Sequence, residues 1–171
     1  LYMVTGEKKY ADWDEHTFLN SILSSQNPET GMTTYFQPMA SGYFKVYSSP
    51  FDSFWCCTGT GMENFSKLGE SFYFTKGTDL VVNQYISSKL NLNKNKQLLE
   101  QKSFIPMDNY SEFIFSDKYS GNLLLRIPEW CSSKVAVCVN NQPYDYEEKD
   151  GYAVITGPFK KGSTVKILLP M

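Results

Sequence analysis

Residues 134–157 read KVAVCVNNQPYDYEEKDGYAVITG, and this stretch decides the fold class. Two short runs rich in Val, Ala and Ile flank the turn dipeptides Asn140-Asn141 and Asp150-Gly151. Apolar runs bounded by Asn, Asp and Gly are typical of β-strands joined by tight turns. The stretch therefore predicts a set of short antiparallel strands.

The same pattern extends over the second half of the chain, from Phe72 onward. Its turns include Lys76-Gly77 and Ser120-Gly121, and residues 89–97 (KLNLNKNKQ) are predicted to be a polar connector. The spacing of the runs predicts an antiparallel β-sandwich. The runs are FYFT (72–75), LVVNQYIS (80–87), QLLEQKSF (97–104), EFIFS (112–116), NLLLRIPEW (122–130), KVAVCV (134–139), YAVITG (152–157) and TVKILLP (164–170).

The first half has a helical pattern. Residues 6–31 predict one amphipathic helix that ends in SSQNPETG. Met32 to Phe54 favours extended segments or a hairpin, and a second helix is expected after Cys57, ending near Gly69. In the first helix one face is expected to carry Trp13, Leu19, Ile22 and Leu23, while Asp12, Asp14, Glu15 and Asn20 are expected to face outward. In the second helix Thr58 or Thr60 is expected to be the cap.

Composition excludes some classes of partner. With a net charge of −2 and no long Lys/Arg run, nucleic acid is not an expected partner. No apolar run approaches the roughly 20 residues that cross a bilayer, so we expect a soluble protein without a membrane partner. The opening Leu-Tyr-Met-Val suggests a piece of a longer polypeptide, and the compartment stays open.

Of the four cysteines, two have ordinary explanations. Cys138 alternates with valines, which predicts a buried, small-apolar role, and Cys131 follows Trp130 at a turn without a chemical role. The other two, Cys56 and Cys57, stand side by side in FWCCTGTGMEN, just before a predicted helix. A helix N-terminus stabilises thiolates, which attack carbon or bind metals such as zinc.

A zinc ion held by this thiol pair needs two further ligands. The chain offers His16, its only histidine, with Glu63 and Asp52 near the pair in sequence. His16 is more readily explained as a polar helix residue, and Glu63 as an acid that complements the helix dipole. From spacing alone, a simple buried cysteine pair is as good an interpretation as a functional site.

Several phrases resemble glycoside hydrolase family 127, the bacterial β-L-arabinofuranosidases. The most specific is SFWCCTGTGMENFSKLGESFYF (53–74), and weaker ones follow in the β-rich half. The others are KKYAD (8–12), ILSSQNPETGMTTYFQPMASGYFKVYSSPFDSF (22–54), LLLRIPEW (123–130), VAVCVNNQP (135–143), DGYAVI (150–155) and ILLPM (167–171). The resemblance runs essentially from end to end.

The family resemblance implies a fold and an activity. Members have an (α/α)6 barrel followed by β-sandwich domains, and they hydrolyse terminal β-L-arabinofuranosides with retention. The chain would be α+β by content, with residues 1–75 as the C-terminal part of the catalytic barrel. Residues 76–171 would form an incomplete β-sandwich. The partner is then a carbohydrate substrate, together with the missing N-terminal part of the barrel.

The resemblance also implies roles for individual residues. Cys56 would be the nucleophile and, with Cys57, a ligand of the zinc cofactor. Trp55 and Tyr35 are candidates for substrate binding, although strand or core packing explains each of them at least as well. The remaining zinc ligands and the acid/base Glu would lie upstream of Leu1, so the fragment alone is expected to be inactive. The sequence TGTGMEN (58–64) replaces a proline-rich version in some members, so the preferred sugar need not be arabinofuranose.

One further expectation follows from the barrel. Helices taken from a barrel expose the apolar side that their neighbours cover, so Trp13 and Leu19 are predicted to lie exposed.

Two other classes of function remain open. The β-rich half could be a non-catalytic sandwich that supports a barrel or binds carbohydrate, and its aromatic residues fit either role. A redox switch formed by the adjacent thiols ranks last, because the CxxC spacing of thiol-exchange proteins is absent.

Overall fold

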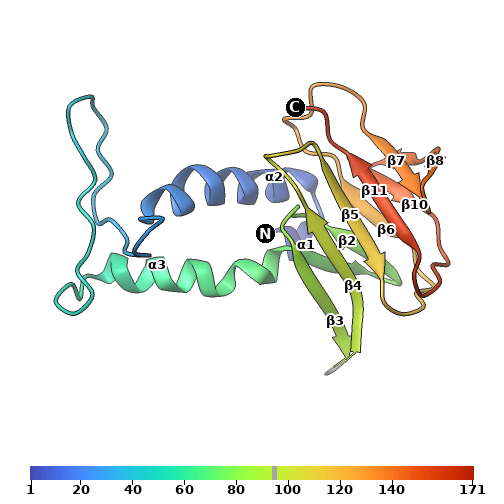
Figure 1. Cartoon of the computed structure of the whole chain (residues 1–171), viewed down its shortest axis with the longest axis horizontal. Helices are drawn as coiled ribbons and strands as arrows, with labels where there is room; N and C mark the ends of the chain where they lie inside the picture. Colours follow the sequence, from blue (N-terminus) through green and yellow to red (C-terminus); the bar gives the residue numbers. More distant parts are fainter. Residues whose placement is uncertain (94–95) are drawn as a thin grey trace. The chain divides into compact units, whose positions relative to one another are not determined.

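The structure is a computed structural model that describes residues 1–93 and 96–171. The chain forms two compact units, one made of Leu1–Asp12 with Ser71–Met171 and the other of Trp13–Glu70. Figure 1 shows the strands of the first unit and the long helices and loops of the second. The predicted α+β composition with an antiparallel sandwich is confirmed.

The first unit is a sandwich of two sheets. Leu80, Val82, Leu123 and Leu125 of one sheet share a core with residues such as Phe113 of the other. One sheet has the order β1 (Tyr73–Lys76), β2 (Asp79–Val82), β6 (Leu123–Arg126), β10 (Tyr152–Ile155) and β9 (Glu147–Lys149). The other has the order β3 (Ser88–Asn93), β4 (Lys96–Ser103), β5 (Tyr110–Phe115), β11 (Thr164–Leu168), β7 (Ala136–Val139) and β8 (Gln142–Tyr144).

All eight predicted runs contain a strand, and two of the predicted turns have two consecutive residues with positive φ. Asn140 and Asn141 join β7 to β8 with φ values of 49° and 64°. Asp150 and Gly151 join β9 to β10 with φ values of 52° and 79°. Two consecutive residues with positive φ match the twist of a tight hairpin, which is why Asn, Asp and Gly occur there. Among the described pairs β2–β6 is parallel, and the others are antiparallel.

The prediction of a polar connector at residues 89–97 is wrong for the described part of that segment. β3 occupies Ser88–Asn93 and pairs with β4, while residues 94 and 95 lie outside the described residues. Leu90 explains the strand, because it pairs with Leu99 and packs against the core between polar neighbours. Strands β8 and β9 were also not predicted, because they are three residues long and mostly polar.

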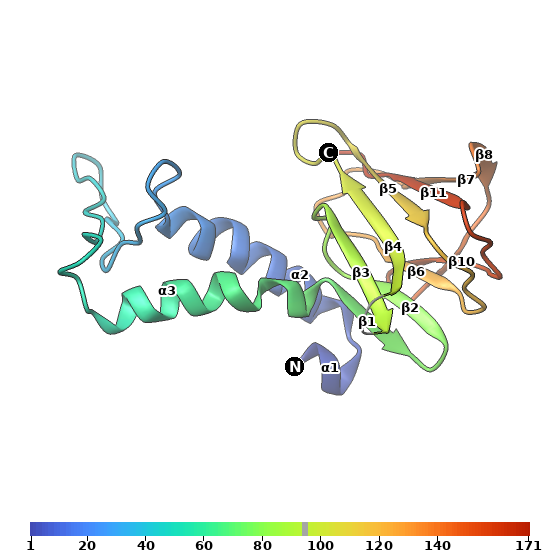
Figure 2. The same cartoon turned by 60° about the horizontal axis from the view of Figure 1, so that its bottom comes forward.

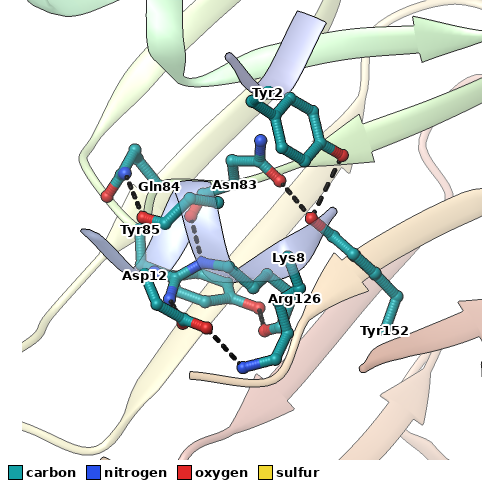
Figure 3. Close-up of polar contacts among 9 residues, drawn as sticks. Tyr2, Lys8, Asp12, Asn83, Gln84, Tyr85, Arg126 and Tyr152 are labelled. Carbon is teal, nitrogen blue, oxygen red and sulfur yellow. Dashed lines mark hydrogen bonds and ion pairs between the residues drawn. The ribbon is translucent and has the colours of Figure 1, made fainter. Parts of the chain in front are cut away.

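The prediction that Asp12 faces outward is wrong as well. Helix α2 (Lys8–Thr17) buries Asp12 in the sandwich unit, where its carboxylate accepts hydrogen bonds from Arg126 and Lys8, each at 2.5 Å (Figure 3). Arg126, on β6, is fully buried and also donates from Nε to the carbonyl of Asn83 at 2.5 Å. Periodicity places polar residues outside, but a carboxylate is stable inside when cations pair with it.

Tyrosines and an amide surround this ion pair. The hydroxyl of Tyr152 donates to Asn83 Oδ1 at 2.8 Å, and the hydroxyl of Tyr85 donates to the carbonyl of Arg126. Gln84 donates to the carbonyl of Ala11 on α2 at 3.3 Å (Figure 3). The start of α2 is therefore held to the sandwich by buried polar contacts as well as by apolar packing. Before α2, a single helical turn, α1 (Tyr2–Thr5), ends at Gly6 with φ 68°.

The second unit is helical with one long irregular loop. α2 continues as a π-helical turn (Phe18–Ile22) and a 3-10 turn (Leu23–Ser25), and α3 (Cys56–Lys67) ends in a 3-10 turn (Leu68–Ser71). Phe18 and Phe65 meet edge to face with centroids 6.1 Å apart, and Figure 2 shows the two helical segments side by side.

The segment predicted as extended or as a hairpin forms no regular strand. It has hairpin-like pairing only at its base, where Thr34 bridges Tyr47 and the amide of Ser48 donates to the carbonyl of Thr33. Beyond this base, most of residues 35–46 form a loop with large exposed side chains.

The predicted exposure of the first helix is confirmed, since Trp13 is 71% exposed and Leu19 is 50% exposed. Over the described residues, we find no helix that is both long and apolar enough to cross a bilayer.

Candidate functional site

The candidate site begins at the N-terminus of α3. Trp55 is extended, with φ −75° and ψ 150°, and Cys56 is the first helical residue. The helix therefore begins before the predicted start after Cys57. Neither predicted threonine caps the helix: Thr60 Oγ1 donates back to the carbonyl of Cys56 at 3.2 Å, and no side-chain hydrogen bond caps the helix at Trp55. Both cysteines consequently lie in the first turn, where the helix dipole favours negative charge.

The two thiols lie close together without a covalent bond. Sγ of Cys56 and Sγ of Cys57 are 3.7 Å apart, whereas a disulfide requires about 2.05 Å. Two thiolates bound to one tetrahedral zinc at about 2.3 Å are separated by about 3.8 Å, from the tetrahedral angle. The observed separation fits two of the four ligands of a zinc ion.

The two thiols also form a hydrogen bond with each other. The pKa of the Cys57 thiol is raised, first by its hydrogen bond with Cys56, then by partial burial and by the charge of the neighbouring sulfur. Two adjacent thiols therefore resist losing both protons unless a cation compensates the charge.

Further metal ligands are not gathered around the pair. Among residues 1–93 and 96–171, no cluster of three or more His, Cys, Asp or Glu side chains is arranged to hold a metal. His16 is exposed on α2, as the surface interpretation predicted, and Glu63 forms an ion pair with Lys67. The pKa of the Glu63 carboxyl is lowered by that lysine.

Cys138 lies on the face of β7 opposite the core and is half-buried, so the prediction of a buried role is wrong in degree. Val135 and Val137 occupy the core face instead, and the alternation of a strand turns Cys138 away from it. Cys131 is also half-buried.

Trp55 and Tyr35, the two candidates for substrate binding, lie together. Their rings meet edge to face with centroids 5.7 Å apart. Both line an open pocket of about 660 Å³ whose other walls come from the loop 36–46. Neither Cys56 nor Cys57 lines this pocket, although Cys56 directly follows Trp55 in the chain.

The base of the loop packs against α3 where Thr33 lies close to Gly61. A Cβ added at Gly61 of α3 would lie 2.8 Å from Cγ2 of Thr33, so the glycine permits the approach of the loop base. A smaller pocket of about 350 Å³ lies there, lined by Thr33, Trp55 and Thr58 among others. Thr58 Oγ1 is a buried atom without a hydrogen-bond partner.

The aromatic residues Phe36, Tyr43 and Phe44 of the pocket were not singled out from sequence. Their runs, TTYF and GYFKVY, have a strand-like composition, which favours core packing as the explanation. Their clustering around Trp55 depends on how the loop folds back, and no sequence period encodes that.

Comparison with known proteins agrees with these observations. The model of the GH127 β-L-arabinofuranosidase catalytic domain matches residues 1–70, and that of the GH127 middle domain matches residues 79–171. A comparison with curated protein sequences gave no match.

Three solved structures have the same fold over nearly the whole chain. A GH127 β-arabinofuranosidase is 26% identical over 100% of this chain, with a TM-score of 0.84. A GH127 β-L-arabinofuranosidase from Geobacillus stearothermophilus T6 is 24% identical over 99% of it, with a TM-score of 0.78. A glycoside hydrolase is 24% identical over 99%, with a TM-score of 0.79. The chain covers 30%, 29% and 30% of these three structures, respectively.

These matches place the chain in a family of glycoside hydrolases. That family is GH127, the β-L-arabinofuranosidases, and the chain belongs to it. The resemblance inferred from the sequence is confirmed.

Proposed function

We propose that this chain is part of a retaining glycoside hydrolase that acts on terminal β-L-arabinofuranosides or related glycosides, with Cys56 as its nucleophile. The observation that carries the proposal is the thiol pair, 3.7 Å apart in the first turn of α3, in a member of the GH127 family. In this proposal residues 1–75 belong to the catalytic barrel and residues 76–171 to the sandwich. The remainder of the barrel would come from outside the chain.

The thiol pair also supports a zinc site. Cys56 and Cys57 would hold the ion, and two further ligands would come from outside the described residues. When bound, zinc would keep both sulfurs deprotonated near neutral pH.

Cys56 would act in two displacements. Its sulfur attacks the anomeric carbon, so a C–S bond forms while the bond to the leaving oxygen breaks. The leaving oxygen takes a proton from a carboxylic acid located outside this chain. Water then attacks the same carbon and gives its proton to the carboxylate that acted as the acid, while the C–S bond breaks and the sulfur returns to its thiolate form. Two inversions at one carbon give net retention, as in carboxylate-based retaining glycosidases.

The positive end of α3 contributes to the first step. It favours negative charge on a sulfur in its first turn, both before attack and when water displaces it again. Trp55, next to Cys56, supplies an apolar wall that limits water on one side of the reacting carbon.

A substitution series in the full-length protein tests the role of Cys56. Cys56→Ser is expected to lower kcat/KM on an aryl β-L-arabinofuranoside by about 1,000-fold or more, because the alcohol is a far poorer nucleophile. Cys138→Ser, a matched control on the outer face of β7, is expected to retain activity. Wild-type activity in Cys56→Ser would remove the nucleophile assignment.

The alternative of a carbohydrate-binding sandwich lacks comparable support. Among the described residues of that unit, Phe104 is the one aromatic side chain with a large exposed surface, and sugars are bound by exposed aromatic faces. We therefore propose a structural role for the sandwich. Titration with plant-type oligosaccharides tests it, and a saturable response that depends on Phe104 would contradict it.

A further inference from the structure

We infer that the aromatic pocket formed by Trp55 and the loop 35–46 binds the leaving group of the glycoside, and that this leaving group is uncharged with an apolar ring face. The inference rests on the proposed function, because it takes Cys56 as the point where the glycosidic bond breaks.

The pocket has a fixed frame. Thr34 bridges Tyr47 at the base of the loop, and Gln37 donates to Thr34 Oγ1 at 2.6 Å. Thr33 lies against Gly61 of α3, so the loop base is anchored to the same helix that carries Cys56. The loop walls therefore hold a defined position relative to the thiols within this unit.

The lining determines the chemistry of the ligand. Among the described residues that line the pocket there is no Asp, Glu, Lys, Arg or His, so these walls offer no charged partner to an anionic or cationic group. Phe36 and Phe44 are 79% and 81% exposed, and Tyr35, Tyr43 and Trp55 add three more rings. Aromatic faces bind other ring faces by stacking and by burial of apolar area.

The sugar itself fits this pocket poorly. Its hydroxyl groups need several polar partners, but the polar groups of the lining side chains are two phenols, the indole N–H of Trp55 and the amide of Gln37, which already bonds to Thr34. The sulfurs also lie outside the lining, while Trp55 and Cys56 are adjacent. A sugar carbon at Cys56 would therefore place the sugar beside the pocket and the leaving group within it. A volume of about 660 Å³ accommodates one such ring group.

Two substrates of the full-length protein that share one sugar test this inference. One carries a p-nitrophenyl leaving group and the other carries fluoride, which has no ring to bind. Phe36→Ala and Phe44→Ala are each expected to lower kcat/KM for the aryl substrate by about tenfold, but to change it by no more than about twofold for the fluoride. Phe51→Ala removes an equally exposed phenylalanine that does not line the pocket, and it is expected to affect neither substrate.

The results separate this inference from the proposed function. Equal losses of kcat/KM on both substrates in Phe36→Ala and Phe44→Ala, or no loss on the aryl substrate, would overturn the leaving-group assignment. The proposed glycoside hydrolase activity would still stand. If the wild type cleaves neither substrate, the proposed function fails. Calorimetric titration with p-nitrophenol then tests whether the pocket binds an aromatic ring. Saturable binding that Phe36→Ala and Phe44→Ala remove, but Phe51→Ala retains, would support an aromatic-ring site. Absence of saturable binding to the wild type would overturn it.

Discussion

The buried ion pair between Asp12 and Arg126 gives the sharpest prediction about stability. Arg126 has no exposed side-chain surface and Asp12 has 6%, so neither charge can be solvated in place when its partner is removed. Breaking a buried pair from one side costs about 3–5 kcal/mol, because a buried charge is left uncompensated. Asp12→Ala is therefore expected to lose about that amount of unfolding free energy, a large part of the about 5–15 kcal/mol that a domain typically has.

Matched variants isolate the cause of this loss. Lys8, whose side chain is 24% exposed, also bonds to Asp12, and Lys8→Met is expected to cost at most about 1 kcal/mol because water can replace it. Asp14→Ala removes an exposed carboxylate from the same helix and is expected to change stability by about 0.5 kcal/mol or less. Replacing both charges, as in Asp12→Leu with Arg126→Met, is expected to recover part of the loss.

Urea unfolding of the chain, followed by far-UV circular dichroism, measures these differences as shifts of the midpoint at constant slope. If Asp12→Ala does not fold, Asp12→Asn preserves the shape while removing the charge and gives the measurable value. A loss under about 1 kcal/mol in both variants, equal to that of Asp14→Ala, would refute the reasoning.

Three further predictions follow from individual contacts. Gly121→Ala would place a Cβ 1.7 Å from the carbonyl oxygen of Thr78. Thermal unfolding is therefore expected to show a loss of about 2 kcal/mol or more in the free energy of unfolding. An unchanged unfolding midpoint would contradict the close approach. Gly61→Ala is expected to destabilise the helical unit, because the added Cβ would meet Thr33. Gly59→Ala has open space at its Cβ and is expected to stabilise α3 by up to about 1 kcal/mol. Hydrogen exchange of the loop base measures both variants, and identical effects would count against the Thr33 contact. Burial raises the pKa of Tyr73 to about 12, whereas the pKa in the unfolded chain is about 10. The neutral phenol therefore contributes its full stability below about pH 10, and this contribution is lost as the pH rises from about 10 to 12. Tyrosinate absorbance compared with Tyr73→Phe checks this, and ionisation of Tyr73 near pH 10 would contradict it.

The sandwich could be predicted from sequence because its signals are local. Alternation of apolar and polar residues and the Asn140-Asn141 and Asp150-Gly151 turns reveal strands and hairpins without any knowledge of the rest of the chain. β3 was missed because its two apolar residues, Leu90 and Leu92, stand among Asn and Lys, and the packing of Leu90 against the core depends on pairing with β4. The parallel β2–β6 pair likewise joins strands about 40 residues apart, which no local pattern encodes.

The site was predictable only in part. Two adjacent cysteines before a helix indicated thiolate chemistry, and the structure brings their sulfurs close together. The burial of Asp12 and the aromatic pocket both arise from contacts between distant segments. Helix periodicity assigns Asp12 to the solvent, and strand propensity assigns Phe36 and Phe44 to a core, so each was explained by the wrong local rule.

The most direct test of the central claim is the site of covalent labelling during turnover. The full-length protein is mixed with an aryl β-L-arabinofuranoside, quenched in acid, digested and analysed by peptide mass spectrometry. We predict a pentosyl adduct on Cys56, absent from Cys56→Ser. Hydrolysis that proceeds with the adduct on a carboxylate, or with Cys56 unmodified under conditions that trap the intermediate, would contradict the account.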